Sequence, residues 1–233
     1  MRQVAAFFHG KRFRSAGLAT FGPVDPAKGV ITNKTPKVAW RGCRLQDRLE
    51  QALGVSVRTD TDVNGAALAE SRWGAAVGVD PFLYITVGTG IGVGVMVNGG
   101  LLHGMLHPEA GHLLLPRARG DAFIGCCPVH RDCLEGLACG PAIAARLQGG
   151  QTEEEAVRFA ADALAKGLLS LSYAFSPQLL IVGGGVIKRK GLLAAVRLEM
   201  KRWNSDYVSL PNVVRPKLGD RAGVLGALAL AGA

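Results

Sequence analysis

The stretch Val55-Ser56-Val57-Arg58-Thr59-Asp60-Thr61-Asp62-Val63-Asn64 is the one on which the prediction of an α/β fold depends. Val55–Arg58 is typical of a strand, and beyond Asn64 the pattern becomes helical as far as Gly74. Asp62 and Asn64 therefore lie at a strand-to-helix junction. In an open α/β sheet, ligands bind at such junctions, at the carboxyl ends of strands.

Other segments of the sequence show the same strand and helix patterns. Thr152 and Glu155 form a capping box that opens a long helix, which Pro177 stops. The Asn98-Gly99-Gly100 segment predicts a hairpin turn, because these residues tolerate positive φ. Further strands are predicted at Ala16–Phe21, Phe82–Thr86, Val93–Val97 and Gln178–Val182, and further helices at Gln46–Leu53 and Ala222–Leu230.

Composition indicates a soluble globular protein. The chain has 233 residues, enough for one large domain or two small ones, and 48% of them are hydrophobic. No apolar run reaches membrane-spanning length, and Met1–Phe13 lacks the features of a secretion signal. Five cysteines, an odd number gathered mostly in one loop, fit a reducing compartment, so a cytoplasmic location is expected.

The net charge of +9 would suit nucleic acid or acidic ligands. Lys and Arg are spread through the sequence without a basic block or interleaved aromatic residues, so no nucleic-acid partner is expected. Phosphorylated small molecules would use this charge equally well.

A metal site is predicted from His112, Cys127, His130 and Cys133. Imidazole and thiolate are the ligands that zinc prefers, and the last three residues stand three apart, so one tight loop can direct them to a single point. A site with four protein ligands leaves no open position, so this zinc would be structural. Cys126 could replace Cys127, and buried free thiols or a disulfide are the alternatives.

Two glycine-rich stretches follow strands. Gly88-Thr89-Gly90-Ile91-Gly92 leaves backbone N–H groups uncovered, with a hydroxyl from Thr89, which suits phosphate oxygens. Gly183-Gly184-Gly185 would let the backbone lie against a flat ligand such as a nucleotide base or ribose. The alternative for Gly88–Gly92 is a glycine-rich turn, and the alternative for Gly183–Gly185 is tight helix packing.

Three acidic residues are candidates for chemistry. Asp62 could take a proton from an attacking hydroxyl, or it could only cap a helix. Glu109 and Glu135 flank the predicted metal loop, and carboxylates of this kind bind polyols, although surface glutamates are common.

Taken together and in this order, these segments resemble the ROK family of sugar kinases, most closely its fructokinase (mannofructokinase) branch. The similarity runs from about residue 16 to the end of the chain. The segments that carry it are Thr20–Asp25, Thr35–Lys37 with Trp40, Thr61–Ala67, Thr86–Gly92, His107–His112, Cys127–Gly136 and Val182–Gly185. The His-Pro-Glu-x-Gly-His and Cys-Pro-x-His-x-x-Cys elements are highly specific.

The resemblance implies an actin-like (ribonuclease H-like) ATPase fold of two lobes, which transfers the γ-phosphate of ATP to a hexose with Mg²⁺. It implies that Asp62 is the catalytic base, and that Asn64, Glu109, His112 and Glu135 lie at or near the sugar. It further implies that Gly88–Gly92 faces phosphates, that Gly183–Gly185 faces adenosine, and that His112 also binds the structural Zn²⁺. A homodimer is expected.

The sequence departs from the family at its start. Family kinases begin with an Asp-x-Gly-Gly-Thr-Lys phosphate motif, which this sequence does not contain. We therefore expect a truncated N-terminal lobe over residues 1–75, and a C-terminal lobe over residues 76–233 that carries the zinc loop, about 107–136. The alternatives to a hexose kinase are a catalytically impaired sugar-binding or regulatory remnant and, from the charge alone, a nucleic-acid binder.

Overall fold

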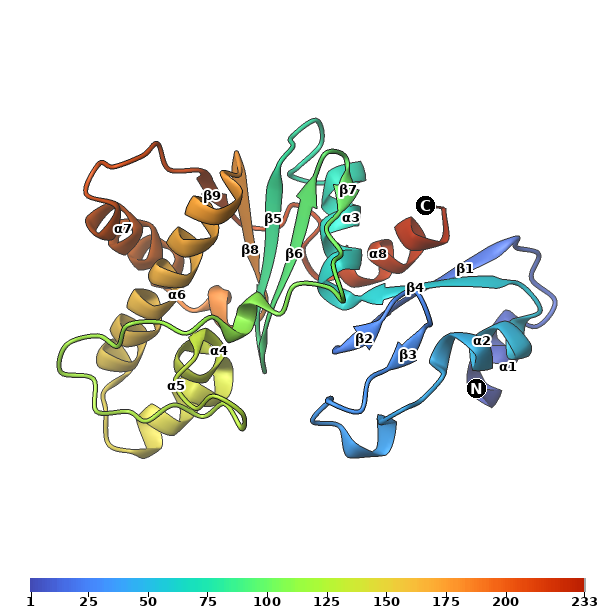
Figure 1. Ribbon diagram of the computed structural model, residues 1–233, viewed down its shortest axis with the longest axis horizontal. Helices are drawn as coiled ribbons and strands as arrows, with labels where there is room; N and C mark the ends of the chain where they lie inside the picture. Colours follow the sequence, from blue (N-terminus) through green and yellow to red (C-terminus); the bar gives the residue numbers. More distant parts are fainter. Residues whose placement is uncertain (233) are drawn as a thin grey trace. The chain divides into compact units, whose positions relative to one another are not determined.

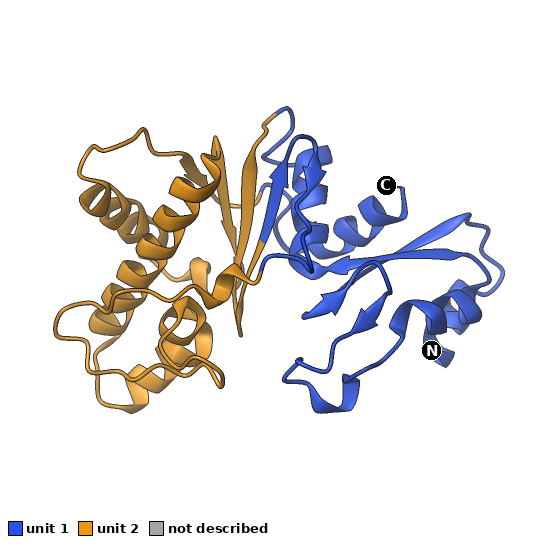
Figure 2. Cartoon of the chain, in the orientation of Figure 1, with its two compact units in different colours: residues 1–78, 94–108, 217–233 blue, residues 79–93, 109–216 orange. Residues whose placement is uncertain are grey.

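The computed structural model describes residues 1–232, which form two compact units (Figures 1 and 2). Unit 1 comprises Met1–Gly78, Gly94–Pro108 and the segment from Lys217 onward, and unit 2 comprises Val79–Val93 and Glu109–Pro216. The boundary predicted between residues 75 and 76 lies close to the first change of unit. The prediction assigned the two later segments of unit 1 to the other lobe, because a linear reading cannot show that a chain returns to its first unit.

Unit 1 is built on a pair of parallel strands, β1 and β4, aligned so that Thr20 pairs with Thr61. A short antiparallel hairpin, β2 and β3, follows β1. The strands of unit 1 outside the larger sheet are β1 (Ser15–Thr20), β2 (Val24–Asp25), β3 (Val30–Ile31) and β4 (Ser56–Thr61). Its helices are α1 (Arg2–Phe8), η1 (Val38–Trp40), α2 (Leu45–Leu53), α3 (Asp62–Trp73), η4 (Gly219–Arg221) and α8 (Ala222–Ala231).

Helix α8 packs closely against α3 and β1, and glycines make the approach possible. A Cβ on Gly17 of β1 would overlap the carbonyl oxygen of Ala227 in α8. Gly226 of α8 lies against the backbone of Gly65 in α3 in the same way. The C-terminal helix is therefore part of the same core as the first strand.

A second sheet has the strand order β7-β6-β5-β8-β9. Strands β5 and β8 pair in parallel, as do β8 and β9, whereas β6 and β7 form an antiparallel hairpin. Its strands are β5 (Phe82–Val87), β6 (Ile91–Val97), β7 (Gly100–Leu101), β8 (Leu179–Gly183) and β9 (Asn212–Val214). The predicted turn is confirmed, because Asn98 and Gly99 both have positive φ, 54° and 72°.

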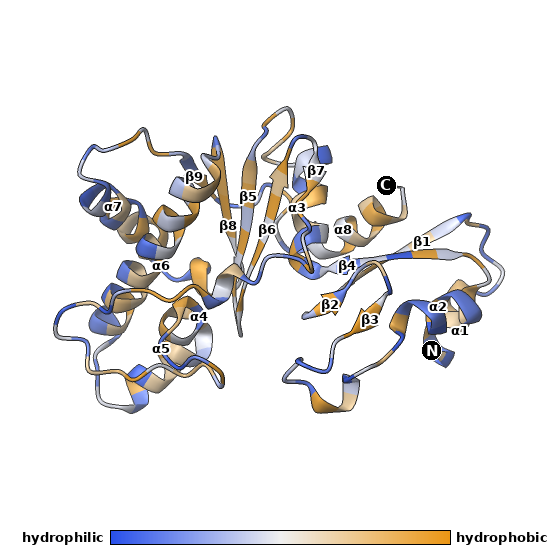
Figure 3. Cartoon of the chain, viewed as in Figure 1, coloured by the Kyte–Doolittle hydropathy of each residue, from blue (hydrophilic) through white to orange (hydrophobic). Residues whose placement is uncertain are grey.

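Helices of unit 2 cover strands that are almost entirely apolar, as Figure 3 shows for β5 and β8. The long helix α6 packs against α7 and α4, and its predicted capping box between Thr152 and Glu155 is confirmed. The helices of unit 2 are η2 (Ala110–His112), α4 (Leu134–Ala138), α5 (Gly140–Gln148), α6 (Glu153–Phe175), η3 (Val186–Lys188) and α7 (Leu192–Asn204). No helix within residues 1–232 has both the length and the apolar character needed to cross a membrane.

The carboxylate of Glu70, near the end of α3, joins distant parts of unit 1. The residue is fully buried, and it accepts hydrogen bonds from the backbone N–H groups of Ala75 (2.6 Å), Lys217 (3.3 Å) and Leu218 (2.9 Å). These bonds fix the end of α3 to the chain that enters α8.

We predict that Glu70→Ala lowers the free energy of unfolding by about 3 kcal/mol or more, because three N–H groups lose their shared acceptor in a buried place. Urea denaturation followed by circular dichroism measures this. The exposed Glu154→Ala is the control and should cost less than about 1 kcal/mol. Equal stability of the two variants would show that Glu70 does not hold the two segments together.

Candidate functional site

Asp62 is the first residue of α3, at the end of β4. The helix cap is its neighbour Thr61, whose hydroxyl accepts a hydrogen bond from the N–H of Asn64 at 3.1 Å. The alternative that Asp62 serves only as the cap is therefore wrong, since Thr61 fills that role. Asp62 accepts a hydrogen bond from the N–H of Val63 at 2.8 Å, and its side chain stays open to solvent.

Desolvation by the surrounding protein raises the pKa of Asp62 above its usual value, although the side chain is reachable from outside. The N–H of Val63 and then the charge of Lys37 act in the opposite direction. A carboxylate that is accessible and more basic than an ordinary aspartate is suited to accept a proton.

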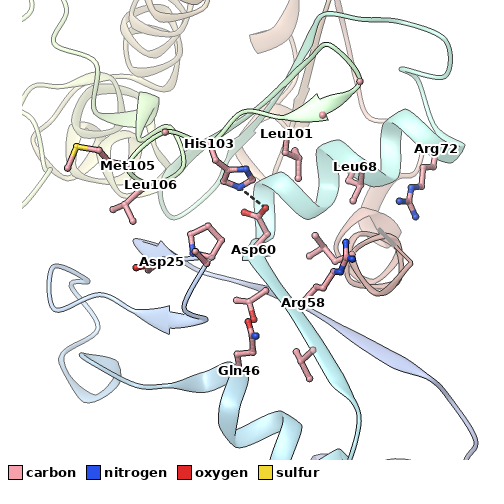
Figure 4. A pocket seen from close by; sticks show the side chains of 18 residues that line it. Asp25, Gln46, Arg58, Asp60, Leu68, Arg72, Leu101, His103, Met105 and Leu106 are labelled. Carbon is pink, nitrogen blue, oxygen red and sulfur yellow. Dashed lines mark hydrogen bonds and ion pairs between the residues drawn. The ribbon is translucent and has the colours of Figure 1, made fainter.

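Sequence reasoning missed Asp60, which organises this junction. Asp60 is 4% exposed and accepts hydrogen bonds from the N–H of Thr61 (2.7 Å), from Nδ2 of Asn64 (2.7 Å) and from Nε2 of His103 (2.9 Å). Figure 4 shows the contact with His103 as a dashed line. Asn64, predicted at the sugar, is fully buried and its amide nitrogen is bound to Asp60.

The two glycine-rich stretches lie side by side at the carboxyl ends of β5 and β8, where Thr86 pairs with Gly183. Gly184 has a φ of 93°, and a Cβ there would overlap the backbone of Val87, so only glycine fits. The carbonyl of Gly88 accepts the N–H of Gly140, the first residue of α5, at 2.7 Å. The loop Gly88–Gly92 and Gly183–Gly185 thus occupy the edge where α/β proteins bind nucleotides.

Glu135 connects the glycine loop, Gly88–Gly92, to the predicted metal loop, about residues 107–136. Its Oε2 accepts the N–H of Ile91 at 2.9 Å, and a Cβ on Gly90 would lie 2.6 Å from the same atom. Glu109 belongs to the same unit, and desolvation followed by the charge of Glu135 raises its pKa to about 7. The residues of unit 2 that are predicted to bind the sugar therefore lie next to the glycine loop.

The four predicted metal ligands come together. Their ligand atoms all lie within 4.8 Å of one another, and Nδ1 of His112 is 3.7 Å from Sγ of Cys127 and 3.5 Å from Sγ of Cys133. Ligands at zinc–sulfur and zinc–nitrogen distances of about 2.0–2.3 Å span tetrahedral edges of similar length. Cys126 faces elsewhere, with its sulfur 3.6 Å from that of Cys139. All five cysteines are free.

The donors fit zinc chemically as well. Burial raises the pKa of Cys133 to about 11, so without a metal this sulfur is a protonated thiol in a buried environment. A bound cation would stabilise the thiolate and so offset the burial.

Comparison with known proteins identifies the family, since the chain matches the ROK family over residues 5–233. It belongs to the ROK family. The fructokinase of Zymomonas mobilis is 42% identical, over 94% of this chain and 78% of that protein. A putative fructokinase of Bacillus subtilis is 37% identical, over 99% of this chain and 83% of that protein.

Solved structures of ROK proteins give the same fold. A ROK hexokinase from Thermus thermophilus superposes with a TM-score of 0.83 at 33% identity, covering 100% of this chain and 86% of that one. A ROK glucokinase from Streptomyces griseus, in complex with glucose and AMPPNP, gives 0.78 at 28% identity, covering 98% and 85%. The predicted actin-like ATPase fold is thus confirmed.

We predict about one zinc ion per chain, held by His112, Cys127, His130 and Cys133. Cys133→Ser should lose the metal and much of the soluble yield, because a buried thiolate ligand is removed. Metal analysis of purified protein measures this, and Cys43→Ser, outside the cluster, is the control. A folded wild-type protein that takes up no zinc would contradict the site.

Proposed function

We propose that this protein phosphorylates a hexose with ATP, with fructose as the preferred acceptor and Asp62 as the general base. The exposed, more basic carboxylate of Asp62 at a strand-to-helix junction is the observation that carries the proposal. The fructokinase relatives support the substrate class.

In this mechanism Asp62 accepts the proton of the sugar hydroxyl as its oxygen attacks the γ-phosphorus. The bond between that phosphorus and the β–γ bridging oxygen breaks, and ADP leaves. Because phosphoryl transfer needs mainly positioning and charge stabilisation, the protein has little other chemistry to perform. Mg²⁺ brought in with ATP would neutralise charge on the phosphates.

Backbone groups supply most of the proposed nucleotide contacts. Gly88, Gly90 and Gly92, with the hydroxyl of Thr89, would face the phosphates, while Gly183–Gly185 would lie against adenosine. The AMPPNP bound by the Streptomyces griseus relative supports ATP as the donor.

Carboxyl groups and an imidazole would hold the sugar. Glu109, His112 and Glu135 can accept or donate hydrogen bonds to hydroxyls, with Asn64 as a further predicted contact. Burial and the charge of Glu135 raise the pKa of Glu109 to about 7, so near neutral pH Glu109 can serve as donor or acceptor. The proposal includes the homodimer and the cytoplasmic location predicted from the sequence.

A coupled ADP-release assay with ATP, Mg²⁺ and fructose, mannose or glucose tests the function. We expect turnover with the highest kcat/KM for fructose, and a kcat about 100-fold to 10,000-fold lower in Asp62→Asn, because the base is lost. Asp206→Asn is a matched exposed control and should keep full activity.

Absence of turnover with all three sugars would overturn the kinase assignment. If fructose then protected the chain against heat while ATP did not bind, a sugar-binding remnant would replace it. Full activity of Asp62→Asn would remove Asp62 from the role of base.

The pH dependence gives a second test of Asp62. A base works only when ionised, so kcat/KM should fall as the pH drops through a pKa that desolvation has raised above the usual aspartate value. Lys37 lowers this pKa, so Lys37→Gln should move the acid limb to higher pH, whereas Lys34→Gln should leave it in place. An acid limb that moves downward in Lys37→Gln would contradict the assignment.

A further inference from the structure

A cavity of about 630 Å³ lies within unit 1, and Asp62 is not among the residues that line it. Its volume falls in the range of about 300–1,000 Å³ typical of small-molecule sites. The lining comes from four consecutive residues of β4, from the β6–β7 turn and the segment that follows it, from residues 25–27, and from α2, α3 and α8.

One side of the cavity is positively charged. Arg58 of β4 and Arg72 of α3 both line it, and Figure 4 shows the two side chains on the same side. Both residues are exposed, and within residues 1–232 neither guanidinium has an ion-pair partner. Two guanidinium groups that line one cavity without an ion-pair partner favour an anion, and a phosphate group suits guanidinium donors.

His103 also lines the cavity, and its imidazole suits a hydroxyl. His103 uses Nε2 on Asp60, which leaves its Nδ1 for another contact.

We propose that this cavity is a second binding site, for a phosphorylated sugar. The phosphate binds Arg58 and Arg72, and a sugar hydroxyl binds Nδ1 of His103. The site itself rests on the cavity and its unpaired groups, while the choice of a sugar phosphate rests on the proposed function, whose product belongs to this class.

Isothermal titration calorimetry with fructose 6-phosphate tests the site. The wild-type chain should bind two equivalents, one where the product leaves the active site and one in the cavity. The double variant Arg58→Gln/Arg72→Gln should bind one equivalent. Each single variant should lower the affinity of the cavity for fructose 6-phosphate about 10-fold or more, the usual effect of losing a charge-assisted hydrogen bond. Arg119→Gln, an exposed arginine of unit 2, is the control and should bind two.

The sugar part of the ligand has its own measurement. His103→Gln should weaken the binding of fructose 6-phosphate in the cavity and leave the binding of inorganic phosphate unchanged. Circular dichroism checks that every variant is folded. The kcat for fructose should be unchanged in the arginine double variant, because these residues do not take part in the transfer.

Two results would overturn the proposal. One is an unchanged number of equivalents in the arginine double variant. The other is inorganic phosphate that binds the cavity as tightly as fructose 6-phosphate, which would make it a plain anion site. Because calorimetry needs no turnover, a chain that binds at the cavity but fails the ADP-release assay would remove the proposed function and leave the second site standing.

Discussion

The contact between the glycine loop and the metal loop is the interaction on which unit 2 depends. Ile91 donates its N–H to Glu135, and its carbonyl lies so close to Gly111 that any larger residue there would overlap it. The loop proposed to face phosphates and the residues proposed to hold the sugar are therefore one packed block. Movement in one would be transmitted to the other, because close-packed interiors do not absorb such shifts.

The proposed zinc would give this block a second restraint. Nδ1 of His112 points at the sulfurs of Cys127 and Cys133, so its Nε2 is left for another partner. A metal that holds one edge of the ring also orients the other edge. In unit 1, hydrogen bonds of Asp60 and of the Thr61 cap fix the start of α3 and leave Asp62 open to solvent.

Local patterns in the sequence predicted what local physics determines. The capping box at Thr152, the hairpin at Asn98-Gly99 and the strand-to-helix change before Asp62 all depend on neighbours within a few residues, and all are found. The metal cluster was predictable because three of its members lie in one short loop. The choice between Cys126 and Cys127 was not, since adjacent residues point to different places only after the loop has folded.

Long-range contacts account for what the sequence could not show. His103 lies 43 positions from Asp60, and Leu218 lies 148 positions from Glu70, so neither pair is marked by spacing. The return of residues 94–108 and of the C-terminal helix to unit 1 has the same origin. Each of these contacts is set by tertiary packing, which no local periodicity encodes.

The central claim is that a metal-braced loop shapes the sugar site, and fructose affinity with and without the metal tests it most directly. Calorimetry would compare the zinc-loaded chain with the chelated one, with circular dichroism showing that both remain folded. We predict that removing zinc weakens fructose binding about 10-fold or more, because His112 loses its orientation. Equal affinity in the two forms, both folded, would contradict the account.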